Sequence, residues 1–251
     1  MSSKVPRFAG FAARSSQMGS VTNLKLAMET AGFGESSEER IFFTGPWSSD
    51  DRTRHMRLQA RKAAAGLMRE FVARGMETES HCERVAIWAR RLARELGLSS
   101  ERVLDVELGA LLHDIGYISL ASVDFHREST LSHADLFELR RHCELGAALL
   151  YRIPVLRRAI PLVLSHHEEF GGSGYPSGAS GVAIPIDGRI FHLVDAFESM
   201  TSDRPYRARV SEEDARIEIA SQTGKLFDPV VEAAFNRIDP VEWRGLVASV
   251  G

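Results

Sequence analysis

Apolar side chains recur at intervals of three and four residues along most of the chain from residue 56 onward. The first stripe covers residues 56–71, and the next runs through residues 85–96. This spacing gathers apolar side chains on one face of a helix, which is typical of helices that pack against a core. No segment shows the alternation of apolar and polar residues that a half-buried strand would have. The pattern therefore predicts an all-α fold.

Glycine, proline and capping residues divide this pattern into separate helices. Gly97 and Gly116 are expected to end the helices before them. Ser132 and Asp135 have the spacing of a capping box, and Pro154 suits the first turn of a helix. The predicted helices cover residues 56–71, 77–96, 100–115, 132–151, 154–166, 186–200, 212–222 and 229–238.

The first fifty residues carry the weakest pattern. Residues 21–31 fit a short helix, and Gly45-Pro46 followed by residues 48–51 is typical of a linker that ends in a helix N-cap. We therefore expect an N-terminal extension of unknown role over residues 1–52 and a single domain over residues 53–251.

Composition narrows the class of protein. The 251 residues are 44% hydrophobic and 26% charged, as in an ordinary globular protein. A net charge of -3 argues against binding to nucleic-acid polymers or to a membrane surface, so an anionic substrate would need local cations. Two cysteines cannot form a disulfide framework, and no run approaches the roughly 20 apolar residues of a spanning helix. We expect a cytoplasmic protein.

Histidines and carboxylates occur where the predicted helices end. His113-Asp114 precedes Gly116, and His166-His167 precedes a glycine-rich turn over residues 171–176. Adjacent side chains on a helix diverge by about 100°, so both members of a pair can face one cluster only near a helix end. Imidazoles and carboxylates gathered beside such a loop are typical of a metal-dependent hydrolase site.

Four further positions fit the same site. Glu77 and His81 are four residues apart and would share one face of a helix. His142 is expected to point toward a core-facing surface. Asp195 follows a strongly apolar stretch, where a bare carboxylate would cost several kcal/mol unless a cation accompanied it.

Each of these features also has an ordinary structural explanation. A buried histidine is more often a hydrogen-bonded core residue than a ligand, and Arg189 could be the partner of Asp195. Cys82 and Cys143 each follow a candidate ligand histidine, but that position is expected to point elsewhere, as a buried free thiol. The joint order of the motifs favours a metal centre.

This order of motifs resembles the HD-GYP domain, a branch of the HD superfamily of metal-dependent phosphohydrolases. The resemblance covers residues 55–240 and implies a helical bundle. The matching segments are His81 with Arg84-Val85-Ala86, Leu111-Leu112-His113-Asp114-Ile115-Gly116, His142 with Gly146, His166-His167-Glu168, Gly172-Ser173-Gly174-Tyr175-Pro176, and Asp195 with the segment from Thr201 to Arg207.

The resemblance implies hydrolysis of cyclic di-GMP, a bacterial second messenger, to linear pGpG, GMP or both by a metal-activated hydroxide. It implies two or three divalent ions, with iron or manganese expected, and Glu77 would support the third. His113 and Asp114 would be catalytic, and Asp114 would bridge two ions. The metal ligands implied are Glu77, His81, His113, Asp114, His142, His166, His167 and Asp195.

Substrate contacts are also implied, together with departures from the family pattern. Arg204 and Arg207 match cationic positions for a phosphate, and Tyr175 would reach over the nucleotide. Tyr117 replaces the lysine of the usual His-Asp-x-Gly-Lys motif and offers only a neutral hydroxyl to the substrate. Glu198 stands where aspartate is common.

Two alternatives to this enzyme function stay open. The chain could be a weak or inactive cyclic di-GMP receptor that signals through a protein partner, or it could hydrolyse another nucleotide. A homodimer also stays open.

Overall fold

Helices form all the regular elements in the part of the chain that the structure describes. The computed structural model describes residues 49–120, 132–203, 208–248 and 250. Within them there is no strand, only an isolated bridge between Thr223 and Phe227. The predicted all-α class is confirmed. The predicted helix at 21–31 lies outside the described residues.

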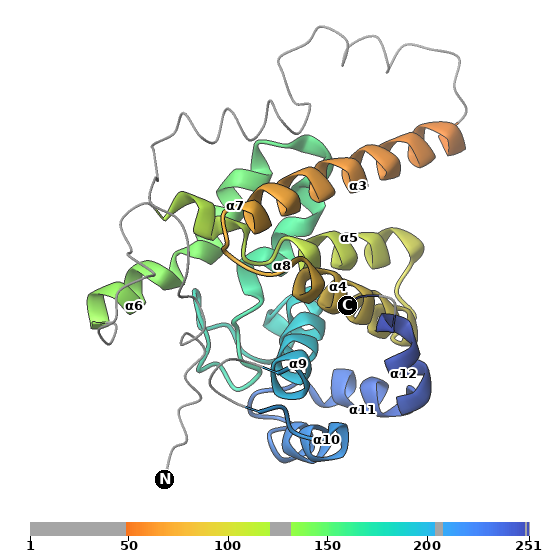
Figure 1. Ribbon diagram of the computed structural model, residues 1–251, viewed down its shortest axis with the longest axis vertical. Coiled ribbons are helices and arrows are strands. Elements are labelled where there is room, and N and C mark those ends of the chain that lie inside the picture. The colour runs from red at the N-terminus through yellow and green to blue at the C-terminus, as the bar shows by residue number, and fades with distance from the viewer. Residues whose placement is uncertain (1–48, 121–131, 204–207, 249, 251) are drawn as a thin grey trace, which may run out of the picture.

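Ten α-helices and three short 3-10 helices follow one another in these residues (Figure 1). Their bounds are α3 Ser49–Ala73, α4 Glu79–Glu95, α5 Ser100–Leu111, η1 Ile115–Ser119, α6 His133–Arg140, α7 His142–Tyr151, η2 Pro154–Ala159, α8 Ile160–Ser165, η3 Gly181–Ala183, α9 Ile186–Thr201, α10 Glu212–Ser221, α11 Pro229–Arg237 and α12 Pro240–Val247.

Several predicted boundaries are wrong. The helix expected over 100–115 ends at Leu111, and Gly116 lies inside η1. The helix expected over 132–151 is two helices that meet at Arg141, although the predicted capping box between Ser132 and Asp135 is present. The structure also contains α12, which the apolar pattern did not predict.

Two apolar clusters hold the helices together. One packs Trp88, Phe197 and Trp243 between α4, α9 and the C-terminal helices α10 to α12. The other packs Leu67 and Phe71 of α3 against α5, η1, α7 and η2. In Figure 1, α3 therefore lies at one end and α10–α12 at the other, with α4, α5, α8 and α9 between them.

None of the helices in the described part of the chain combines the length and apolar composition that a membrane crossing needs.

Candidate metal centre

The predicted ligands from the middle of the chain lie close together although they come from separate elements. Most occupy helix ends, where two neighbouring side chains can face the same space. Their positions are His81 near the start of α4, His113 and Asp114 between α5 and η1, His142 at the start of α7, His166 and His167 just after α8, and Asp195 on α9.

A first group consists of His81, His113 and Asp195. One possible ligand atom from each lies within 4.8 Å of the others. The Nε2 atom of His81 is 4.0 Å from Oδ1 of Asp195. Both histidines are buried, so this group could hold an ion away from bulk water.

A second group consists of His142, Cys143, His166 and His167. Their ligand atoms also lie within 4.8 Å of one another. The Nε2 atoms of His142 and His166 are 3.1 Å apart. Cys143 was expected to point elsewhere, but its Sγ lies 3.5 Å from Nε2 of His142, so that part of the prediction is wrong. The predicted burial of both cysteines as free thiols is confirmed.

Asp114 lies between the two groups and faces both. Its Oδ2 is 3.1 Å from Nε2 of His113 in the first group. Its Oδ1 is 3.2 Å from Nε2 of His142 and 3.5 Å from Nε2 of His166 in the second. A carboxylate with one oxygen toward each group has the arrangement of a ligand shared by two ions.

Backbone carbonyls fix the orientation of three imidazoles. Nδ1 of His113, His142 and His166 lies 2.9, 2.7 and 2.8 Å from the carbonyl oxygens of Ala110, Leu139 and Val163. A carbonyl can only accept, so each Nδ1 carries the proton and donates it. In the neutral ring Nε2 is then left with a lone pair. Metal-binding histidines are commonly oriented in this way by a hydrogen bond from the other nitrogen.

The electrostatics of the cluster fit a cation. Burial lowers the pKa of His166 to about 4, so its Nε2 faces that of His142 as a neutral lone-pair donor at neutral pH. The Oδ1 atom of Asp114 is buried and accepts no hydrogen bond. Although burial opposes a charge there, the Asp114 carboxylate raises the pKa of His113 to about 9. Divalent ions bound to these nitrogens and oxygens would remove the repulsion between lone pairs.

Glu77 is placed differently from the sequence prediction. The helix α4 begins at Glu79 with Thr78 as its N-cap, so Glu77 and His81 do not share a helical face. The Oε1 atom of Glu77 accepts a hydrogen bond of 2.8 Å from the backbone N–H of Thr78. Its charge still helps to raise the pKa of His81, although burial opposes this and Glu198 contributes more.

Glu198 orients His81, a role that the sequence analysis missed. The carboxylate is buried and accepts hydrogen bonds from Nδ1 of His81 at 2.9 Å and Nη2 of Arg84 at 2.6 Å. Nε of Arg84 also donates to it at 3.2 Å, and the hydroxyl of Ser202 donates at 2.8 Å. Although burial opposes the charge, these donors hold the pKa of Glu198 well below its usual range. The contact turns Nε2 of His81 toward the first group.

Replacing Glu198 by glutamine is expected to weaken metal binding by the first group about 10–100-fold, as for other residues that orient ligands. In Glu198 one carboxylate oxygen faces His81 and the other faces Arg84. An amide replaces one of these oxygens by an NH₂ group, which cannot accept a hydrogen bond from the donor that it then faces. Calorimetric titration with Mn²⁺ measures the effect. A Glu213→Gln variant, on the exposed side of α10, is the control. Unchanged affinity in Glu198→Gln would contradict the orienting role.

The structure brings two of the four predicted substrate contacts to the second group. Tyr117 is buried, and its ring stacks on that of His142 with centroids 4.3 Å apart. The ring of Tyr175 stacks on His167 at 4.6 Å, and the guanidinium carbon of Arg140 lies 4.9 Å from its centroid. Arg204 and Arg207 lie outside the described residues.

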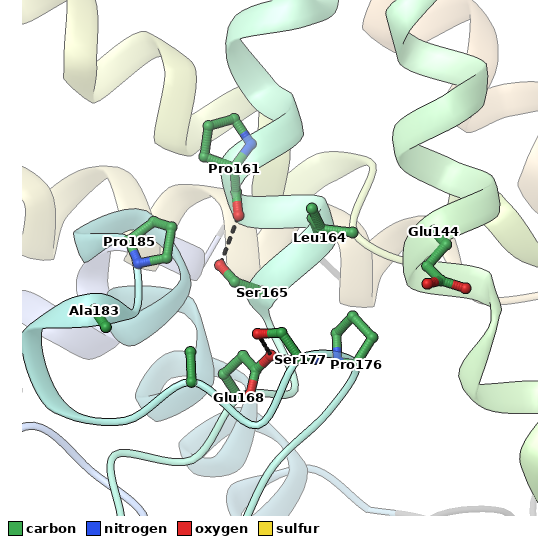
Figure 2. A pocket seen from close by; sticks show the side chains of 10 residues that line it. Glu144, Pro161, Leu164, Ser165, Glu168, Pro176, Ser177, Ala183 and Pro185 are labelled. Carbon is green, nitrogen blue, oxygen red and sulfur yellow. Dashed lines mark hydrogen bonds between the residues drawn. The ribbon is translucent and has the colours of Figure 1, made fainter. Parts of the chain in front are cut away.

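Glu168 anchors the glycine-rich turn that carries Tyr175 through hydrogen bonds. Oε1 of this buried residue accepts hydrogen bonds from the backbone N–H and the hydroxyl of Ser177, at 2.8 and 2.7 Å. Figure 2 shows this contact beside a pocket of about 300 Å³, which Pro161, Pro176 and Leu164 also line. The pocket's lining includes no predicted metal ligand.

Several known proteins are similar to this chain. A family model described as HD domain matches residues 56–231. A cyclic di-GMP phosphodiesterase of Thermotoga maritima is 37% identical over 66% of this chain and 46% of its own length. A cyclic di-GMP phosphodiesterase response regulator of Xanthomonas campestris is 33% identical over 67% of this chain and 45% of its own. The chain thus spans less than half of either relative.

A solved structure shares the fold. A cyclic GMP-AMP specific phosphodiesterase of Vibrio cholerae superposes with a TM-score of 0.55 at 23% identity. The match covers 67% of this chain and 46% of that one.

Proposed function

The chain belongs to the HD domain family, as its motifs predicted, and on this premise we propose that it hydrolyses cyclic di-GMP with bound divalent metal ions. The observation that carries the proposal is the position of Asp114, whose two oxygens face two separate groups of histidines. Relatives named cyclic di-GMP phosphodiesterases support the choice of substrate.

The residues divide into two ligand sets that share one carboxylate. His81, His113 and Asp195 would hold one ion, His142, His166 and His167 the other, and Asp114 both. When bound, the ions supply an activated water molecule and positive charge for the phosphate oxygens. The nitrogen and oxygen donors suit iron or manganese. Glu77 stays a proposed ligand of a third ion.

Positioning of the substrate would fall to side chains around the second group. Tyr175 stacks on His167, and the guanidinium of Arg140 lies over the Tyr175 ring, so a nucleotide phosphate near the ions would lie close to a phenol and a cation. Arg204 and Arg207 remain proposed phosphate ligands. Tyr117 would contribute a neutral hydroxyl where a lysine is usual, and its stacking on His142 supports a place close to the ions.

Other predictions accompany this proposal. The boundary at residue 52, the cytoplasmic location, a homodimer and a protein partner all stay predictions. The family match begins at residue 56, which supports a domain that starts close to residue 53.

The test is to incubate iron- or manganese-loaded protein with cyclic di-GMP without oxygen and to follow products by chromatography. We expect linear pGpG, GMP or both, and none from metal-free protein. 3'3'-cGAMP serves as the comparison substrate. Tight binding of cyclic di-GMP without product would leave a receptor instead of an enzyme, and cleavage of 3'3'-cGAMP alone would show that the substrate is wrong.

A further inference from the structure

The two cysteines of the chain occupy matched positions but face different surroundings. Cys82 follows the ligand candidate His81, Cys143 follows His142, and both thiols are buried and free. Cys82 packs into the apolar cluster beneath α3. The Sγ atom of Cys143 instead lies 3.5 Å from Nε2 of His142 and within 4.8 Å of ligand nitrogens of His166 and His167.

These separations match those between atoms that share one ion. With bonds of about 2.3 Å to sulfur and about 2.1 Å to nitrogen, neighbouring ligands that subtend roughly 90–110° at one ion lie roughly 3.1–3.6 Å apart for sulfur and nitrogen and roughly 3.0–3.4 Å apart for two nitrogens. The Sγ atom and Nε2 of His142 are 3.5 Å apart, and the Nε2 atoms of His142 and His166 are 3.1 Å apart.

The thiol also faces nitrogens that lack protons of their own. Nδ1 of His142 and of His166 donates to a backbone carbonyl, so in each neutral ring Nε2 presents a lone pair toward the space beside Cys143. Without an ion, the thiol can donate to Nε2 of His142. With an ion, sulfur can bind it from almost the same position, so coordination needs little movement.

We propose that Cys143 is a thiolate ligand of the ion held by His142, His166 and His167, an inference that rests on the metal centre of the proposed function. As the sulfur–metal bond forms, the S–H bond breaks and its proton leaves to solvent. The second group then has a soft donor, whereas the first has imidazoles and the harder carboxylate of Asp195. The second group would therefore favour zinc or iron over manganese more than the first group does.

Cobalt substitution tests this ligand without any measurement of activity. Co²⁺ bound to a thiolate gives an intense near-ultraviolet charge-transfer band that nitrogen and oxygen ligands do not give. We expect the band in the full-length cobalt protein and in Cys82→Ser, and its loss in Cys143→Ser at retained circular dichroism. X-ray absorption of the unaltered cobalt protein should show sulfur at about 2.3 Å, a readout that needs no variant.

The cobalt content of each sample is measured as well, because it separates failure of the Cys143 ligand from failure of the whole metal centre. Bound cobalt with no charge-transfer band, or a band that survives in Cys143→Ser, would overturn the role of Cys143 and leave the metal centre standing. If the unaltered protein takes up no cobalt, the proposed metal centre fails and the thiolate ligand fails with it.

Discussion

Replacing Asp114 by asparagine is expected to abolish hydrolysis of cyclic di-GMP and to lower metal affinity more than about 100-fold, since loss of residues that only orient ligands already costs roughly 10–100-fold. The change removes a carboxylate that faces both groups. Asparagine would also place an NH₂ group toward one of the two groups. An NH₂ group donates hydrogen bonds and offers no lone pair to a metal ion.

The fold should survive this change. Side-chain volume is kept, and a buried charge without a hydrogen-bond donor at Oδ1 is removed. Metal content and circular dichroism measured on the same sample therefore separate loss of the site from loss of the fold. Asp50→Asn, at an exposed position in the first turn of α3, is the control. An Asp114→Asn protein that keeps its full metal content would show that the bridging assignment is wrong.

Replacing Gly116 by alanine is expected to reduce the free energy of unfolding by about 3 kcal/mol or more, the upper end of overpacking costs. A Cβ at this position would lie 1.9 Å from the carbonyl oxygen of His142 and 2.6 Å from the backbone nitrogen of Gly146. Backbone cannot rotate away as a side chain can, so η1 and α7 must separate. Because His113 and Asp114 directly precede η1 and His142 begins α7, metal affinity should fall as well.

Thermal unfolding measures the first effect, with a decrease in Tm of roughly 6–12 °C for a domain of this size. Gly245→Ala in α12 is the matched control, because nothing lies within 4 Å of its added Cβ. That variant should be neutral or more stable by up to about 1 kcal/mol, from helix propensity. Equal stability of the two variants would contradict the close contact between η1 and α7.

The sequence predicted the helices well where their signals are local. The stripe over 56–71 lies within α3, and the cap of α6 is present as expected. Helix ends at the site were harder to predict, because histidine side chains help to set them. His113, His142 and His166 each bond the carbonyl oxygen three residues earlier, in the last turn of the preceding helix. That explains a break at Arg141, where no glycine or proline stands.

The candidate ligands could be predicted because their types and order along the chain carry the signal. Their partners could not, because these contacts join distant segments. His81 and Glu198 are 117 residues apart, and no local pattern marks the carboxylate as the partner of that imidazole. Glu77 was placed on a helical face because the sequence did not reveal that Thr78 caps α4. The prediction that Cys143 points away from the site was wrong for a related reason. It assumed that adjacent helical side chains diverge, but Cys143 lies at the start of α7.

An anomalous diffraction map of crystals loaded with manganese or iron tests the two-ion assignment most directly. We expect two peaks, one among His81, His113 and Asp195 and one among His142, His166 and His167, with Asp114 between them. A single peak away from Asp114, or no peak in protein supplied with metal under oxygen-free conditions, would contradict the account.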